Sequence, residues 1–397
     1  MTTATPELDA TVLGPELSVV PWSHPYRAEF RGWLSGNVPA DAEPFDYRER
    51  LEYRRRWQRR LAEDGWAGPS WPEEYGGRGA GPLQQYMYYE ELALARAPQL
   101  MNQAGIILLG QTLMVHGTPE LKARFLPGLL TGDDVWCQGF SEPNAGSDLA
   151  ALRTRARLEG DEWVIDGSKI WTTFAPYAEF CFALVRTDPA ESRHRGLSML
   201  IVPTDLPGVT VRPIAQLLGQ EEFAEVFFDG VRSPRDLMVG GPGDGWKVSL
   251  TMFQFERADQ GFTDHARLLV HMHDIAAALR HAETEAALTP AAIARARDTW
   301  AELWCRCQQL RRLNLRAAVR AEQGEVIGAA GSVAKLFWSE LEQRIAHLST
   351  EVRGAHGILA RSPEVIHLLE SRAYTIFSGT SEIQRNIVAE RLLGLPR

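Results

Sequence analysis

The 397-residue chain lacks long apolar runs, has few cysteines and carries no excess of positive charge. No stretch reaches the roughly 18 consecutive apolar residues that a membrane span needs. The first twenty residues lack the basic start and apolar core of a secretory signal, so a cytoplasmic location is expected. The formal net charge of −9 argues against nucleic acid as the main partner.

The four cysteines do not form a disulfide framework, and the ten histidines show no metal-ligand spacing. Cys305 and Cys307 are two residues apart in a helical segment, so their side chains point in different directions. His271 and His273 are expected to face solvent on a helix. No nucleophile elbow is present, and no dinucleotide-binding glycine motif follows a strand. No metal, hydrolase or Rossmann-type site is therefore predicted.

The hydrophobic periodicity of the sequence changes twice along the chain. A flexible segment at 1–24 precedes helical patterns at 25–130, and short strands separated by Gly, Pro and Asp occupy 131–242. Long helices return at 243–397. The pattern predicts an α+β multidomain chain whose middle domain is an antiparallel barrel or sandwich.

Local signals mark where some of these elements begin and end. Thr118 and Thr289 each precede a proline, which is typical of a capped helix start. The dipeptide Asp166-Gly167 follows the apolar segment 162–165 and predicts a hairpin turn at that point.

Two segments of the middle domain have a composition that suits a cofactor. Residues 136–149, WCQGFSEPNAGSDL, combine glycines with short polar side chains, so their backbone N–H groups can face a phosphate or a polarised ring. A plain loop is the alternative, and composition does not decide between the two. Residues 167–173, GSKIWTT, place a tryptophan beside two hydroxyls, which suits packing on a flavin ring, although a lone tryptophan is more often part of a core.

Together with further segments, these two resemble the acyl-CoA dehydrogenase family. The likeness begins at GWAGPSWPEEYGG (65–77), includes GTPE (117–120) and VFFDGVRSP (226–234), and ends at SGTSEIQR (378–385). It covers most of the chain after its first forty residues. The resemblance implies an N-terminal α-helical domain, a middle β-domain and a C-terminal four-helix bundle, with FAD between them.

The resemblance also implies roles for individual positions. Ser141 would offer a hydroxyl to the pyrimidine side of the flavin, and Thr173 would reach its N5 edge. Ser378 and Gly379 would contact the thioester. The remaining implied contacts to FAD are Gln138, Phe140, Ser147, Trp171, Thr380 and Glu382, and the remaining implied contacts to substrate are Ser147 and Arg257.

In the family's reaction a base removes the α-proton of an acyl thioester, and the β-hydrogen passes to FAD as hydride. Most members have the catalytic carboxylate at the position of Ser378, and a serine hydroxyl is too weak a base to replace it. A second family position, as in isovaleryl-CoA dehydrogenase, is a glutamate before an arginine on the first bundle helix. Glu256-Arg257 in FQFERA (253–258) matches that pair.

The helix around Glu256 supports this assignment by its pattern. Trp246, Leu250 and Phe253 recur at helical spacing and predict one buried face, toward which Glu256 and Arg257 point. Helix pattern alone favours the alternative in which Glu256 only pairs with an arginine. Because Ser378 lacks a carboxylate, we expect Glu256 to be the base, with a pKa raised by burial.

Two departures from the family pattern concern assembly. Residues 279–285, LRHAETE, replace an Arg-Phe-Gly element that reaches a neighbouring subunit's FAD, and only Arg280 is a plausible stand-in. Glu351 stands where the family usually has Gln. Both changes put FAD binding across the subunit interface in doubt and would fit a heteromeric assembly. The sequence predicts a dimer or tetramer and leaves open whether it is a homo-oligomer or a hetero-oligomer.

The sequence thus predicts FAD-dependent dehydrogenation of a branched or bulky acyl thioester to the trans-2-enoyl thioester. The acyl carrier is coenzyme A or a carrier protein, and the electron acceptor is expected to be another flavoprotein. Two alternatives remain: a non-catalytic partner subunit of a heteromeric acyl-CoA dehydrogenase, and a flavin monooxygenase on the same fold.

Overall fold

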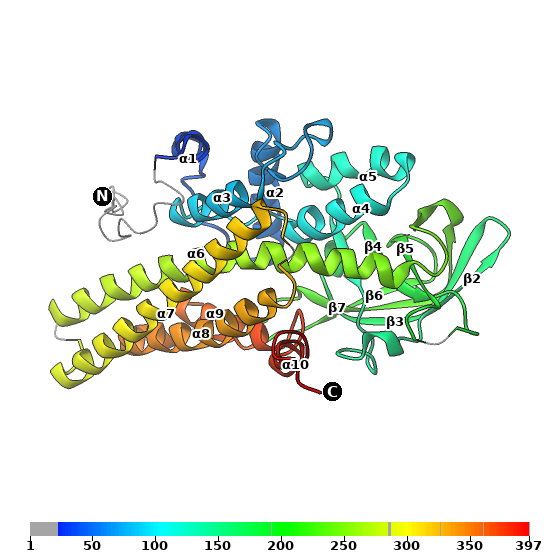
Figure 1. Cartoon of the computed structure of the whole chain (residues 1–397). Helices are drawn as coiled ribbons and strands as arrows, with labels where there is room; N and C mark the ends of the chain where they lie inside the picture. Colours follow the sequence, from blue (N-terminus) through cyan, green and yellow to red (C-terminus); the bar gives the residue numbers. More distant parts are fainter. Residues whose placement is uncertain (1–22, 192, 285–286, 326, 360, 397) are drawn as a thin grey trace.

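The computed structural model describes residues 23–396, apart from 192, 285–286, 326 and 360 and the side chains of 258–261 and 264. The predicted flexible segment at 1–24 therefore lies almost wholly outside the described residues. Helices, a β-sheet and a second set of helices follow one another along the chain (Figure 1). This order confirms the predicted fold class. No helix in the described part of the chain is both long and apolar enough to cross a membrane.

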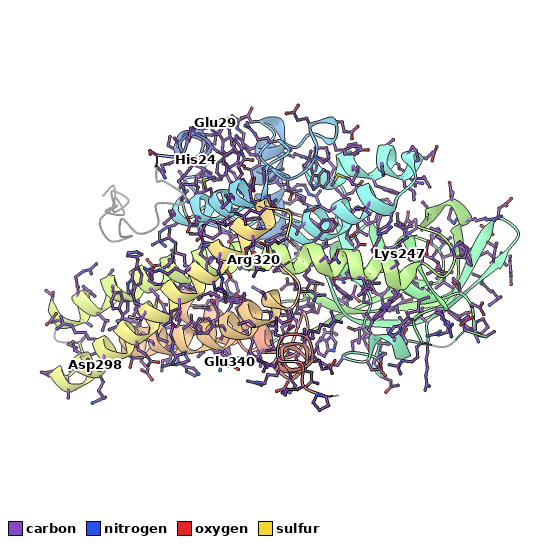
Figure 2. All side chains as sticks on the ribbon, in the orientation of Figure 1. His24, Glu29, Lys247, Asp298, Arg320 and Glu340 are labelled. Carbon is purple, nitrogen blue, oxygen red and sulfur yellow. The ribbon has the colours of Figure 1, made fainter. Side chains whose placement is uncertain are left out.

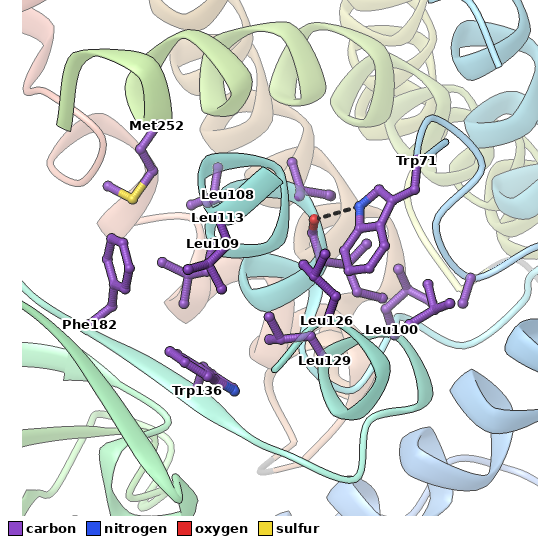
Figure 3. Packing of buried hydrophobic residues seen from close by; sticks show 14 of the residues in the cluster. Trp71, Leu100, Leu108, Leu109, Leu113, Leu126, Leu129, Trp136, Phe182 and Met252 are labelled. Carbon is purple, nitrogen blue, oxygen red and sulfur yellow. Dashed lines mark hydrogen bonds between the residues drawn. The ribbon is translucent and has the colours of Figure 1, made fainter. Parts of the chain in front are cut away.

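The N-terminal region is a set of helices around an aromatic core. The indole of Trp71 is fully buried, and its Nε1 donates to the carbonyl oxygen of Ile106 at 3.1 Å (Figure 3). Thr118 caps a helix as predicted, because its hydroxyl accepts from the N–H of Leu121 at 3.3 Å. The elements are α1 (Pro25–Asn37), α2 (Tyr47–Glu63), α3 (Pro82–Leu94), the π-helical η3 (Gly105–Gly110), α4 (Gln111–His116) and α5 (Pro119–Thr131).

The middle region is one twisted sheet with strand order β6-β7-β3-β2-β4-β5-β8. Most pairs are antiparallel as expected, but β1 pairs with β4 in parallel, and a single parallel bridge joins β2 to β4. The strands are β1 (Trp136–Gly139), β2 (Arg155–Glu159), β3 (Glu162–Thr173), β4 (Phe180–Arg186), β5 (Leu197–Pro203), β6 (Val209–Ile214), β7 (Phe223–Pro234) and β8 (Met238–Val239).

The predicted turn at Asp166-Gly167 is wrong. Strand β3 continues through these residues with a register shift against β7, and the chain reverses earlier, at Gly160. Gly167 is needed for another reason: a Cβ there would lie 2.6 Å from the Cα of Thr154. The glycine therefore permits a close approach of two backbones rather than a turn.

The C-terminal region is helical, and its long helix α6 (Gly245–Thr284) connects it to the rest of the molecule (Figure 1). With 40 residues, α6 is about 60 Å long. It packs against α3 and η3 in its middle and against α7 and α8 further on. The other helices are α7 (Pro290–Glu322), α8 (Ala330–Arg353), α9 (Pro363–Glu370) and α10 (Ser381–Arg391).

Two predictions for this region are confirmed and one is wrong. Thr289 caps α7 through the N–H of Ala292 at 3.2 Å, and on α7 Cys305 is exposed whereas Cys307 is buried. His271 and His273, both expected to face solvent, are only partly exposed: His271 lies beside a carboxylate and His273 against Trp304. Charged side chains such as Asp298, Arg320 and Glu340 point outward from the bundle (Figure 2).

One hydrophobic cluster joins the three regions. It contains Leu109 of η3, Trp136 of β1, Phe182 of β4 and Met252 of α6, which face one another in Figure 3. The shared core positions the first third of α6 against both the sheet and the N-terminal helices.

Candidate active site

The segment 376–380 forms a tight turn between α9 and α10. Ser378 and Gly379 have φ angles of +52° and +87°, so two successive residues adopt the left-handed region. The amide of Gln384 donates to the carbonyl oxygens of both residues at 2.9 and 3.2 Å. The ammonium of Lys335, on α8, donates to the carbonyl oxygen of Gly379 at 2.8 Å. Two buried side chains thus hold this turn in place.

Glu256 meets this turn from α6. The Ser378 hydroxyl donates a short hydrogen bond to Oε1 of Glu256, so residues far apart in sequence share one location. Burial raises the pKa of the Glu256 carboxyl, while the Ser378 hydroxyl and the positive charges of Arg257 and Lys335 offset only part of that rise. The structure therefore brings a carboxylate from α6 to the residue that occupies the usual carboxylate position.

The predicted buried face of α6 is wrong at Leu250, whose side chain is 44% exposed. The residues that enter the core in this part of the helix are Val248 and Met252. Phe253, on the Glu256 side, is only partly buried and meets the ring of Phe140 edge-on at 6.0 Å. Apolar residues occur on more than one side of this segment, so spacing alone selected the wrong face. The Glu256 face of α6 is therefore only partly covered.

A buried ion pair, which sequence reasoning missed, shapes the loop after β1. Nζ of Lys169 lies 2.9 Å from Oε1 of Glu142 and donates to the carbonyl oxygen of Phe140 at 3.2 Å. The Glu142 carboxylate also accepts from the backbone N–H groups of Arg153 and Thr154. Both ion-pair partners lie within the two quoted cofactor segments, one in each, but no spacing in the sequence pairs Glu142 with Lys169.

The same loop is tied to the end of β3. The N–H of Ile170 donates to the carbonyl oxygen of Ser141 at 2.9 Å, which brings the two cofactor segments together. Trp171 follows with a φ of +58° and a side chain that is 59% exposed. Thr173 is partly exposed, while the buried Thr172 hydroxyl has no hydrogen-bond partner within the described residues.

These features fit a flavin. An uncovered indole beside the Ser141 and Thr173 hydroxyls offers both an apolar surface and hydrogen-bonding groups to a planar ring with polar edges. The remaining predicted residues divide between the two regions that meet at Phe140 and Phe253. Gln138, partly buried, and Ser147, exposed, are on the sheet side, whereas Arg257, Gly379, the helix cap Thr380 and the exposed Glu382 are on the helical side.

Comparison with known proteins identifies this architecture. Acyl-CoA dehydrogenase N-terminal, middle and C-terminal domain families match residues 24–133, 137–231 and 243–393. The curated acyl-CoA dehydrogenase IpdE1 of Mycobacterium tuberculosis is 40% identical over 385 residues, covering 94% of this chain and 97% of the relative. The human mitochondrial short-chain specific acyl-CoA dehydrogenase is 31% identical over 330 residues, covering 81% and 78%.

Solved structures agree. A Tcur3481-Tcur3483 steroid ACAD superposes with a TM-score of 0.82 at 34% identity, covering 94% of this chain and 97% of that one. The ChsE4-ChsE5 complex from Mycobacterium tuberculosis superposes with a TM-score of 0.80 at 30% identity, covering 95% and 98%. The three-domain fold and these relatives define an FAD-dependent oxidoreductase. The chain belongs to the acyl-CoA dehydrogenase family.

Proposed function

We propose that the chain catalyses α,β-dehydrogenation of a bulky acyl-CoA thioester, with Glu256 as the base that removes the α-proton. The observation that carries this proposal is the hydrogen bond from Ser378 to Glu256. The missing carboxylate at 378 is compensated by one that reaches the same place from α6. The Gln384 and Lys335 contacts hold the turn against which the thioester binds.

Each group has a separate task in this proposal. Bound FAD supplies a hydride acceptor for the β-hydrogen. Glu256 takes the α-proton, and its raised pKa makes it a stronger base than an exposed carboxylate. The chain would hold FAD with Gln138, Phe140, Ser141, Ser147, Trp171, Thr173, Thr380 and Glu382, and the thioester with Ser147, Arg257, Ser378 and Gly379.

A hollow beside α6 supports a bulky acyl group. It lies between α3, the loop that follows α3, and α6. Its α6 residues, Thr263 and Arg267, are two and three turns past Glu256 on the same face of the helix. An acyl tail that extends from Glu256 along α6 would enter it. The similarity to a steroid ACAD supports a ring-containing acyl group.

Anaerobic mixing of the purified flavoprotein with acyl-CoA thioesters tests the reaction. We expect bleaching of the flavin absorbance, faster with polycyclic or branched acyl groups than with butyryl-CoA. A flavin that is reduced by dithionite but by no acyl thioester, whether the chain is alone or with a co-expressed partner, would contradict the proposal and favour the monooxygenase alternative.

A variant that fills the hollow tests the acyl route. Ala97 lines the hollow, and Ala97→Phe should lower kcat/KM for bulky substrates by roughly tenfold or more while leaving short acyl thioesters little changed. Leu250→Ala, on an exposed part of α6, is the matched control. An equal loss on short and bulky substrates would place the acyl group elsewhere.

A second candidate is one subunit of a hetero-oligomer that completes an active site together with its partner. Exposed apolar side chains support this candidate, because a partner subunit could cover them. Ile358, after α8, is 74% exposed, and Leu393, after α10, is 67% exposed. The similarity to the ChsE4-ChsE5 complex supports it as well. Purification with tagged neighbours, followed by mass photometry and flavin quantification, tests it. A homo-oligomer with one flavin per chain would reject it.

A further inference from the structure

Three side chains with metal-binding atoms meet in the C-terminal region, away from Glu256. His271 on α6, Glu342 on α8 and His367 on α9 have ligand atoms that all lie within 4.8 Å of one another. None of them belongs to the flavin or substrate residues described above. Their sequence spacing gives no metal motif, because each residue comes from a different helix.

The separations match a small coordination site. Oε1 of Glu342 lies 2.6 Å from Nε2 of His367 and 3.6 Å from Nδ1 of His271. Ligands about 2.0–2.2 Å from a tetrahedral ion are roughly 3.4 Å from one another. The 3.6 Å separation already matches this spacing, and the 2.6 Å contact needs to open by less than an ångström. The two imidazole rings are adjacent, with centroids 4.2 Å apart.

A second observation also suggests a ligand. Nδ1 of His271 is buried, yet it makes no hydrogen bond in the part of the chain that the structure describes. A buried ring nitrogen without a partner is costly unless its lone pair or proton is used. The second oxygen of Glu342 accepts from Nε1 of Trp338 at 3.0 Å, which fixes the carboxylate as outer-shell partners do in metal sites.

We propose that His271, Glu342 and His367 form a binding site for a divalent transition metal, with zinc the best match. Two imidazoles and one carboxylate are a ligand set that suits zinc, whereas magnesium and calcium prefer oxygen alone. The Glu342 side chain is 5% exposed and that of His271 is 35% exposed, so the inner ligand is shielded while one side stays open to solvent. Water would complete the tetrahedron.

The site would act on the position of the active-site turn rather than on the reaction. A short 3-10 helix, Ala373–Thr375, joins α9 to that turn. The amide of Gln343 donates to the Ser371 carbonyl oxygen and the Thr375 hydroxyl, both at 3.2 Å. The Trp338 ring stacks on Tyr374 with centroids 5.0 Å apart. A metal that joins α6, α8 and α9 therefore strengthens contacts next to the Ser378 turn.

Equilibrium dialysis of the full-length flavoprotein tests the proposal. The affinity tag is removed, the protein is stripped with a chelator, and zinc chloride is titrated in against a chromogenic competitor. We expect about one zinc ion per chain, and Co²⁺ substitution should give the intense visible bands of a tetrahedral site. His271→Ala and His367→Ala should each weaken zinc binding at least tenfold, because one of three protein ligands is lost.

A histidine on the same helix provides the matched control. His273 lies against Trp304 instead of the cluster, so His273→Ala should retain wild-type zinc affinity. Thermal unfolding gives a readout that does not depend on dehydrogenation: zinc should raise the Tm of wild type and His273→Ala but not that of His271→Ala. No stoichiometric zinc in the wild type, or an equal loss in His273→Ala, would overturn the proposal and leave a hydrogen-bonded carboxylate–imidazole cluster.

Discussion

Two places in the helical region each hold a carboxylate, partly buried at Glu256 and buried at Glu342, and the neighbouring groups shift the pKa of the two carboxylates in opposite directions. Burial raises the pKa of Glu256, and its partners offset that rise only in part. Burial also acts to raise the pKa of Glu342, but the neighbouring imidazoles of His271 and His367 outweigh it and lower that pKa to about 2. Burial is common to both, so the number and charge of the partners decide. The raised pKa at Glu256 suits the proposed base, whereas the lowered pKa at Glu342 keeps that carboxylate ionised beside the two imidazoles.

The largest expected effect comes from removing the poised carboxylate. Glu256→Gln keeps the size and shape of the side chain but cannot accept a proton. Flavin reduction by substrate in stopped flow should therefore slow by at least the roughly 10²–10⁴-fold ascribed to a positioned general base. If Glu256→Gln reduces the flavin at the wild-type rate, the base lies elsewhere.

The double variant Glu256→Gln with Ser378→Glu sharpens this prediction. It returns a carboxylate to the usual family position, so part of the lost rate on straight-chain thioesters should come back. Bulky substrates should gain less, because the longer side chain at 378 occupies space that Ser378 leaves open.

In the His271–Glu342–His367 cluster, Glu342→Gln should lower the stability of the fold rather than the rate of flavin reduction. It removes the charge from the hydrogen bond with His367, so the metal-free protein should lose about 2 kcal/mol of unfolding free energy. The measurement is the urea midpoint of the helical signal, with Glu340→Gln on the exposed side of α8 as the control. Unchanged stability would mean that this pairing contributes nothing in solution.

The pH profile of flavin reduction separates the effects of charge from those of structure. Glu256 must be ionised to act, so the rate should rise with pH through its pKa, which lies above the ordinary 4.5. The positive charge of Lys335 lowers that pKa; Lys335→Gln should therefore shift the acid limb to higher pH. Lys335→Arg keeps the charge and should shift it less. If the acid limb does not move in Lys335→Gln, the charge of Lys335 has no effect on the pKa of Glu256.

Stability should change with pH in the opposite direction. Because the native state holds the Glu256 proton more tightly than the unfolded chain, the native state binds more protons. The contribution of this group to stability is therefore full below the unfolded pKa near 4.5 and is lost as pH rises through the folded pKa. Glu256→Gln should remove that part of the pH dependence in urea titrations made across this range.

The smallest effect is expected from Ser378→Ala. The hydroxyl contributes one hydrogen bond to Glu256, so its loss should cost about 1 kcal/mol, or roughly fivefold in the reduction rate. The acid limb should also move to higher pH, since this hydrogen bond stabilises the ionised form. A loss as large as that of Glu256→Gln would make Ser378 a direct participant in proton transfer.

The sequence allowed the three regions and the helix caps at Thr118 and Thr289 to be predicted, because these depend on local patterns. The assignment of Glu256 used the family resemblance and the missing carboxylate at Ser378, and its catalytic role stays a prediction. Local patterns did not reveal the meeting of His271 with His367, or the Lys169–Glu142 pair, because both depend on how distant elements pack. The error at Leu250 has the same origin, since the covered side of α6 is chosen by the neighbouring regions.

Strand β3 has one further consequence for how relatives are aligned. Lys169 pairs with Val226 and Thr172 with Ala224, so three steps along β3 match two along β7. The extra residue shifts the alternation of buried and exposed side chains along the strand by one position. It assigns the buried side to Thr172 and the open side to Thr173. In a relative without this insertion, a gap-free alignment would exchange the buried and the open position of these two adjacent threonines.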